Sequence, residues 1–327
     1  MSGDRRIAFV LAVITAGAVA LVPLVVRDSF LLKVYTYVGI NVVVVTGLAL
    51  LFGYAGQVSL GHAAFVGLGA YTCALVTTRW HLPWLVAFGA AGAVAALGGF
   101  VLALPSLRLK GHYLAMATLA FGELAALAFA EATPLTGGVD GMSGIPFPSV
   151  LGLSIRTPAG LYWLVWLVAG GVLLLAAMMV GLRPGRAMRA LHGSELGATA
   201  CGVDVVGVKV RVFVVSALFA GLAGALYASV VGFISPGLFT LQASVSYLAM
   251  AVVGGTGSLL GPVVGATLLT LLQYVDALIP GVSQGVAQTV QAIEPGIYGL
   301  AIVLVVILAP GGIGALWRRR AKAREAA

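Results

Sequence analysis

Uncharged apolar stretches, each about as long as a membrane-crossing helix, recur along this chain of 327 residues. An α-helix needs about 20 mainly apolar residues to cross the hydrocarbon core of a bilayer, because each residue adds only about 1.5 Å. The spacing of these stretches predicts an all-α fold, a polytopic membrane helical bundle of about ten transmembrane segments. The ten candidates are residues 7–26, 34–52, 60–78, 83–104, 112–132, 159–182, 211–234, 241–254, 262–279 and 286–309.

Charge is too scarce for a soluble enzyme of this length. Only 9 % of the residues are charged and 61 % are hydrophobic, whereas a soluble domain carries about 25 % charged residues. The net charge of +8 does not indicate nucleic-acid binding, because the basic residues are separated by long apolar gaps. The first run, 7–26, follows two arginines as a signal peptide would, but its length favours a spanning helix.

The distribution of Lys and Arg predicts the orientation of the bundle. If the amino terminus is inside, ten crossings return the carboxyl terminus inside, and the inner segments hold 14 of the 18 basic residues. Both termini are therefore expected in the cytoplasm. The same topology gives an outer loop at 133–158, a cytosolic segment at 183–210 and a basic cytosolic tail at 317–327.

The cytosolic segment is long enough to contain its own helix. Ser194 is expected to cap a short helix that begins at Glu195, and Gly202 is expected to end it. A short helix between two membrane spans, on the cytosolic face, indicates a docking surface for a partner.

A glycine-rich run at residues 53–71 contains three polar side chains, Gln57, Ser59 and His62. Such groups cannot face hydrocarbon cheaply, so they face protein or a wet cavity. They are our candidates for the translocation pathway, and the alternative is a tightly packed helix start whose polar groups bond to neighbouring backbone. A second glycine-rich break at 254–262 suggests an internal repeat, with broken or re-entrant segments at 53–78 and 241–262.

Glu123 is the most central carboxylate within the predicted spans. A central charge costs about 3 kcal/mol to insert, which about eight large aliphatic residues offset, so the span 112–132 remains plausible. Glu123 is thus a further pathway candidate, for gating or for contact with a substrate amine. The alternative is a protonated or hydrogen-bonded group between helices.

Sequence motifs for catalysis and metal binding are absent. No GxxxxGK[ST], HExxH or GxSxG pattern occurs, and the four histidines and two cysteines stand singly. We therefore expect no catalytic residues, no metal site and no hydrolysis of ATP by this chain alone.

Several segments together resemble the permease family of branched-chain amino acid ABC importers, of the LivM type. They include RLKGHYLA at 108–115, TGGVDGMSGIP at 136–146, GRAMRAL at 185–191 and ELGATACG at 195–202, besides 53–71, 223–228, 254–262 and 310–312. The resemblance runs in order along nearly the whole chain. It implies an ABC importer permease architecture, with one transmembrane domain over 1–327, in the bacterial cytoplasmic (inner) membrane.

The resemblance also implies partners. Such permeases pair with a second permease subunit and two cytosolic ATPases, which bind ATP and Mg, and receive an amino acid from an extracytoplasmic binding protein. This chain itself would bind no cofactor. Its ATPase-coupling residues would be Arg186, Arg189, Glu195, Ala198 and Gly202, the last three in a loose form of the family's docking pattern. The alternative is a solvated basic loop, whose charges the positive-inside rule alone predicts.

The function that the resemblance implies is import of leucine, isoleucine or valine by alternating access. One alternative is the same machine with urea, short amides or other amino acids as cargo. Another is an ion-coupled secondary transporter, in which Glu123 would be essential and the cytosolic segment would not. A structural membrane protein is a third alternative, and it leaves the cytosolic segment unexplained.

Overall fold

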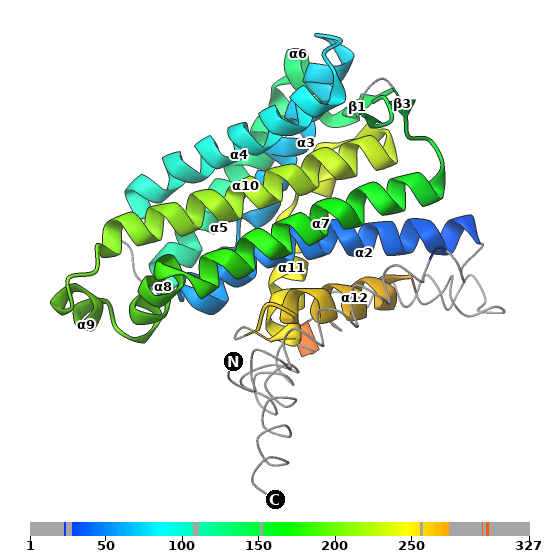
Figure 1. Cartoon of the computed structure of the whole chain (residues 1–327). Helices are drawn as coiled ribbons and strands as arrows, with labels where there is room; N and C mark the ends of the chain where they lie inside the picture. The colour runs from blue at the N-terminus through cyan, green and yellow to red at the C-terminus, as the bar shows by residue number, and fades with distance from the viewer. Residues whose placement is uncertain are drawn as a thin grey trace, which may run out of the picture.

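Long apolar helices lie side by side in a computed structural model of the chain (Figure 1). The structure describes residues 23, 28–106, 111–150, 153–255, 258–274, 296 and 299–300. Its larger helices are α2 (Ser29–Leu48), α3 (His62–Thr78), α4 (Trp84–Ser106), α5 (His112–Glu131), α7 (Pro158–Gly181), α8 (Arg183–Gly193), α10 (Val205–Val231), α11 (Leu241–Gly254) and α12 (Gly261–Gln273). The predicted all-α fold is confirmed.

Eight of the ten predicted spans fall on helices of the described residues. Six stretches are long and apolar enough to cross a membrane, while α3 and α12 are shorter. The six are Ser29–Tyr54, Trp84–Pro105, His112–Glu131, Pro158–Gly181, Val205–Val231 and Pro236–Gly254. The predicted spans 7–26 and 286–309 lie outside the described residues, as does the tail 317–327, so the count of about ten stays a prediction.

Polar side chains fix where several helices begin. The Asp28 carboxylate accepts a hydrogen bond from the backbone N–H of Phe30, and Thr157 caps α7 in the same way. Asp204 caps α10 by accepting from the N–H of Gly207 at 3.0 Å. This cap starts α10 six residues before the predicted boundary at 211, so its first turns carry Lys209 and Arg211. The hydrophobic pattern missed these turns because they are charged.

The centre of the bundle is the crossing of α10 with α3 and α4. A Cβ atom on Gly224 would collide with the carbonyl oxygen of Val66, and one on Gly69 would collide with Gly221. On the other side of α10, Gly221 lies against Ala91 and Ala95 of α4. Small residues at these positions let the backbones approach closely, which is how helices associate where no hydrophobic force drives them together.

The segment 133–158 folds over one end of the bundle, opposite α8 and α9 (Figure 1). It contains the short helices α6 (Thr133–Thr136) and η2 (Gly138–Asp140). Strand β1 (Met142–Ser143) pairs antiparallel with β4 (Phe233–Ile234), which follows α10. A second pair joins β2 (Ser149–Val150) to β3 (Leu153–Ser154). The pairing of β1 with β4 ties the segment to the end of α10.

Two breaks interrupt the helices. Helix α2 continues into a π-helical turn, η1 (Ala49–Tyr54), and the chain then runs without regular structure to Gly61. Helix α11 ends at Gly254, and α12 begins at Gly261 and packs against α11. At 14 and 13 residues, α11 and α12 are each shorter than the roughly 20 residues that a bilayer requires.

Candidate functional site

Helices α8 and α9 (Glu195–Ala200) form a surface at one end of the bundle, and we call them together the coupling segment. The Ser194 cap expected from the sequence is present, with its hydroxyl accepting from the N–H of Gly197 at 3.1 Å. Gly202 follows α9 with a positive φ of 76°. The sequence analysis named 185–191 for its resemblance but predicted no helix there, whereas the structure has α8, a helix of 11 residues immediately before the cap.

One face of the coupling segment is anchored and the other is exposed. Met188, Leu191 and Ala198 are buried against the bundle. Arg186 and Arg189 are exposed, and Arg189 donates a hydrogen bond to the carbonyl of Val180 at 3.3 Å. Leu196, at the tip, is 81 % exposed. Contact of such a large apolar side chain with water is unfavourable, and burial against a partner would remove it. The exposed face, which also includes Arg183, therefore offers cations and one large apolar side chain for contact.

Glu195 holds the coupling segment to the start of α10. Its carboxylate lies 2.5 Å from the ammonium of Lys209, whose side chain is only 8 % exposed. Both residues line a cavity of about 390 Å³ at the base of the coupling segment. The other walls include Gln57, His192 and the first residues of α5. The fold thus brings one predicted pathway residue and one predicted coupling residue to a single cavity.

The predicted pathway residues of the first break are enclosed by protein. Gln57, Ser59 and His62 are all buried. His62 Nε2 lies 3.3 Å from the Ser216 hydroxyl of α10, but His62 Nδ1, Ser59 Oγ and Gln57 Oε1 have no hydrogen-bond partner in the part of the chain that the structure describes. These orphaned atoms are costly in a membrane protein, so this is a polar cluster that water or a rearrangement would stabilise.

Backbone bonds tie this polar cluster to three other helices. The N–H of Leu60 donates to Thr118 of α5 at 3.0 Å, and that of Ala63 donates to Ser244 of α11 at 3.0 Å. With the Ser216 contact, the start of α3 is therefore held by α5, α10 and α11. A movement of any of these helices would therefore displace the residues of the polar cluster.

Glu123 lies apart from the polar cluster. It is exposed on the face of α5 that turns away from the bundle, and within the described residues it has no hydrogen bond or ion pair. Among the described residues, Glu123 is thus not the hydrogen-bonded interhelical group considered from the sequence.

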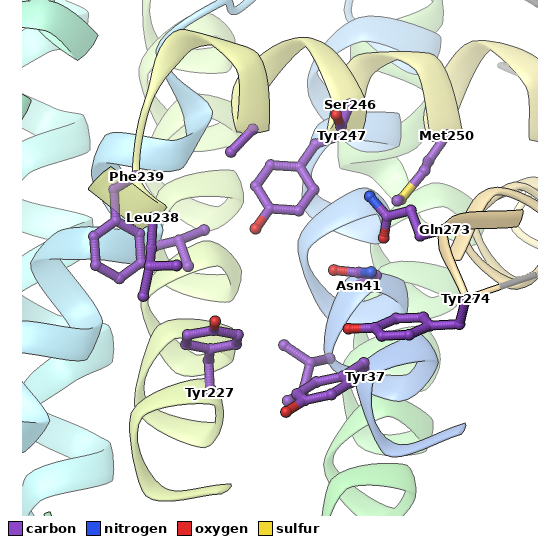
Figure 2. Close-up of a pocket in the computed structure, with 13 residues that line it drawn as sticks. Tyr37, Asn41, Tyr227, Leu238, Phe239, Ser246, Tyr247, Met250, Gln273 and Tyr274 are labelled. Atoms are coloured by element: carbon purple, nitrogen blue, oxygen red, sulfur yellow. The ribbon is translucent and has the colours of Figure 1, made fainter. Parts of the chain in front are cut away.

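A second cavity, of about 200 Å³, lies between α2, α10, α11 and α12, and we call it the aromatic cavity (Figure 2). The sequence analysis did not identify it. The sequence does contain a pattern that could have indicated this cavity, because tyrosines and amide side chains interrupt otherwise aliphatic spans. Its main side chains are Tyr37, Asn41, Tyr227, Phe239, Tyr247, Met250, Gln273 and Tyr274.

Among the described residues, no group of three or more His, Cys, Asp or Glu side chains is arranged to hold a metal ion. The two cavities offer instead aromatic rings, hydroxyls, amides and a single ion pair. Such groups bind and position small molecules and transmit movements between helices.

Comparison with known proteins gives a family match. The family model described as "Branched-chain amino acid transport system / permease component" matches residues 30–310. The high-affinity branched-chain amino acid transport system permease protein LivM of Salmonella typhimurium is 34 % identical over 255 residues. LivM of Escherichia coli K12 is 34 % identical over 281 residues.

The alignments cover 71 % and 77 % of this chain but only 60 % and 66 % of those two relatives, respectively. A shorter match, 33 % identical over 93 residues, is to the probable ABC transporter permease protein YphD of Escherichia coli K12. It covers 27 % of this chain and 28 % of YphD. No solved structure matches the chain.

Proposed function

Because the chain belongs to the branched-chain amino acid permease family, we propose that it is one of two membrane subunits of an ATP-driven importer. The cargo is leucine, isoleucine or valine, and the chain moves it into the cytoplasm by alternating access. The observation that carries this proposal is the coupling segment, a pair of helices anchored on one face and exposed on the other. A channel or an ion-coupled carrier has no need of such a surface.

Partner ATPases supply the energy. ATP and Mg bind to two cytosolic subunits, and their closure pushes on the exposed face of the coupling segment, which includes Arg186, Arg189 and Leu196. The anchored face passes the movement to the bundle through Glu195 and Lys209. In this proposal both termini lie in the cytoplasm, and an extracytoplasmic binding protein delivers cargo at the opposite end.

Helix α5 faces a second permease subunit. Glu123 comes eleven residues after His112, about 16 Å along the helix and close to the bilayer centre. A carboxylate facing lipid there would cost about 3 kcal/mol. The exposed faces of α4 and α7 carry no charged residue and suit lipid. The face of α5 that bears Glu123 is therefore covered by protein or lines a wet pathway between two subunits.

The reconstituted transporter tests this proposal. The chain would be purified with its ATPases, sister permease and binding protein, placed in liposomes and supplied with ATP and radiolabelled leucine. Uptake should require ATP and survive a proton ionophore. Replacing the exposed side chains of the coupling segment, Arg186, Arg189 and Leu196, by alanine should uncouple ATP hydrolysis from uptake.

Ion coupling predicts the opposite pattern. In that case the chain alone would accumulate leucine in response to a proton gradient, Glu123→Gln would abolish uptake, and Glu195→Ala would have little effect. The importer proposal would be overturned by uptake that does not depend on ATP, together with either accumulation of leucine by the chain alone or loss of uptake in Glu123→Gln. Uptake of urea or a short amide in place of leucine would keep the machine and change its cargo.

A further inference from the structure

We propose that the aromatic cavity is a binding site for one amino acid with an aliphatic side chain, within the bundle of this single chain. The inference rests on the proposed function, because it places the cargo of that importer. About six or seven liquid waters would occupy the 200 Å³ of the cavity, so it admits a small organic molecule.

Three tyrosine hydroxyls and one amide oxygen of the cavity need a partner. The hydroxyls of Tyr37, Tyr227 and Tyr247 come from α2, α10 and α11, and no hydrogen bond within the described residues involves them. Asn41 donates from its amide nitrogen to the Thr270 hydroxyl at 2.8 Å, which leaves its oxygen as an acceptor. Unpaired polar groups at membrane depth are costly, so water or a ligand is expected to satisfy them.

The arrangement of these groups suits a zwitterion. Hydroxyls donate to a carboxylate, while the Asn41 oxygen and the faces of the tyrosine rings attract an ammonium group. Figure 2 shows the Tyr227 and Tyr247 side chains reaching toward the cavity from opposite walls, with Asn41 between them on a third. The described residues of the lining include no Asp, Glu, Lys or Arg, so among them a ligand with net charge would find no counterion.

The remaining wall selects an aliphatic side chain. The aliphatic part of the lining consists of Ile40, Val66, Leu238, Ala243 and Met250, while Ser246 adds a hydroxyl that donates to the carbonyl of Gln242. An aliphatic ligand would remove this apolar surface and its own from water, at roughly 25 cal/mol for each Å². Urea has no apolar group to place there, so the lining favours leucine, isoleucine or valine over urea.

Photolabelling of the complete importer tests the site directly. The probe is a leucine analogue with a diazirine on its side chain, activated by light and located by mass spectrometry. We expect the probe to label the α11 peptide, 241–254, or Tyr227. Excess leucine should abolish this labelling, and excess urea should not. Labelling confined to the α5 peptide, 112–131, would overturn this inference and leave the importer proposal standing.

Two substitutions complete the test. Ala243→Leu should fill the cavity and lower both labelling and leucine uptake at least about tenfold, whereas Ala177→Leu, on the exposed face of α7, should change neither. Tyr247→Phe removes one hydroxyl and should weaken leucine binding about threefold to tenfold.

The outcomes separate the two proposals. If the wild-type importer takes up leucine and a correctly assembled Ala243→Leu variant takes it up equally well, the binding site in the aromatic cavity is refuted and the proposed function stands. If the wild-type importer shows no ATP-dependent uptake, the proposed function is refuted. If Ala243→Leu does not co-elute with its partners, the labelling of the wild-type protein decides.

Discussion

The ammonium group of Lys209 is nearly enclosed at the base of the coupling segment, and its partner Glu195 is not. The side chains are 8 % and 30 % exposed, respectively. Removal of one member of a buried pair leaves the other charge uncompensated, and the cost depends on whether that charge can reach water. The two members of this pair are therefore not equivalent.

Glu195→Ala is expected to lower the free energy of unfolding by about 1–3 kcal/mol, less than for a fully buried pair because the carboxylate is partly exposed. Lys209→Met should cost only about 0–1 kcal/mol, since the remaining carboxylate can turn to solvent. Thermal unfolding of the purified importer measures both. Equal losses for the two variants would contradict this asymmetry.

Gly56 joins the first break to the coupling segment. Its φ is +68°, and a Cβ atom there would lie 3.0 Å from His192 Nδ1. Gly56→Ala is expected to destabilise the fold by about 1–2 kcal/mol through the left-handed backbone conformation, with the close contact adding to it. Unfolding of Gly56→Ala with and without His192→Ala separates the two causes. Full recovery in the double variant would assign the whole loss to the contact.

Features that depend on residues close together in the sequence were predicted correctly. The Ser194 cap and the break around Gly56 follow from a few neighbouring residues. The pairing of Glu195 with Lys209 and of Asn41 with Thr270 does not, because these partners are distant in the sequence. The aromatic cavity escaped prediction for the same reason.

The crossing of α10 with α3 and α4 depends on Gly221. A Cβ atom there would collide with Ala95, and the carbonyl oxygen of Ala91 is also close. Gly221→Ala should therefore destabilise the bundle by about 1–3 kcal/mol, although alanine favours helix. Gly171→Ala is the matched control, because nothing lies near that position on α7. Thermal unfolding in detergent should show a loss only for Gly221→Ala.

Hydropathy located the helices because burial in lipid requires long uncharged runs. The helices α2, α4, α5, α7 and α11 lie close to their predicted ranges. The same signal missed α8, which carries Arg186 and Arg189, and the first turns of α10, which carry Lys209 and Arg211. The pairing of β1 with β4 was also beyond prediction, since it joins residues 142–143 to 233–234.

Helix α2 links the two ends of the bundle. Tyr37 and Asn41 on this helix line the aromatic cavity, and its π-helical continuation leads to Gly56 beside His192 of α8. A displacement of the coupling segment could thus reach the cavity along one continuous element. A π-helical turn is a common feature of functional sites, because its wider ladder accommodates a change of helical register.

The exposed faces of α5 and α7 should differ in what covers them. Both are apolar over much of their length, but only α5 carries a carboxylate near the bilayer centre. A photoreactive amino acid in place of Leu124, which is 65 % exposed beside Glu123, should crosslink the chain to a second permease subunit. In place of Leu174, 63 % exposed on α7, it should label lipid.

Gel electrophoresis and mass spectrometry of the irradiated importer distinguish these products. The control is Glu123→Gln in the variant that carries the photoreactive amino acid at position 124, since this substitution removes the charge and keeps the rest of the helix face. A protein crosslink from position 174 with lipid labelling at position 124 would reverse the assignment. In that case the carboxylate of Glu123 would face hydrocarbon at a cost of about 3 kcal/mol, and the reason for its position would have to be sought in the bilayer.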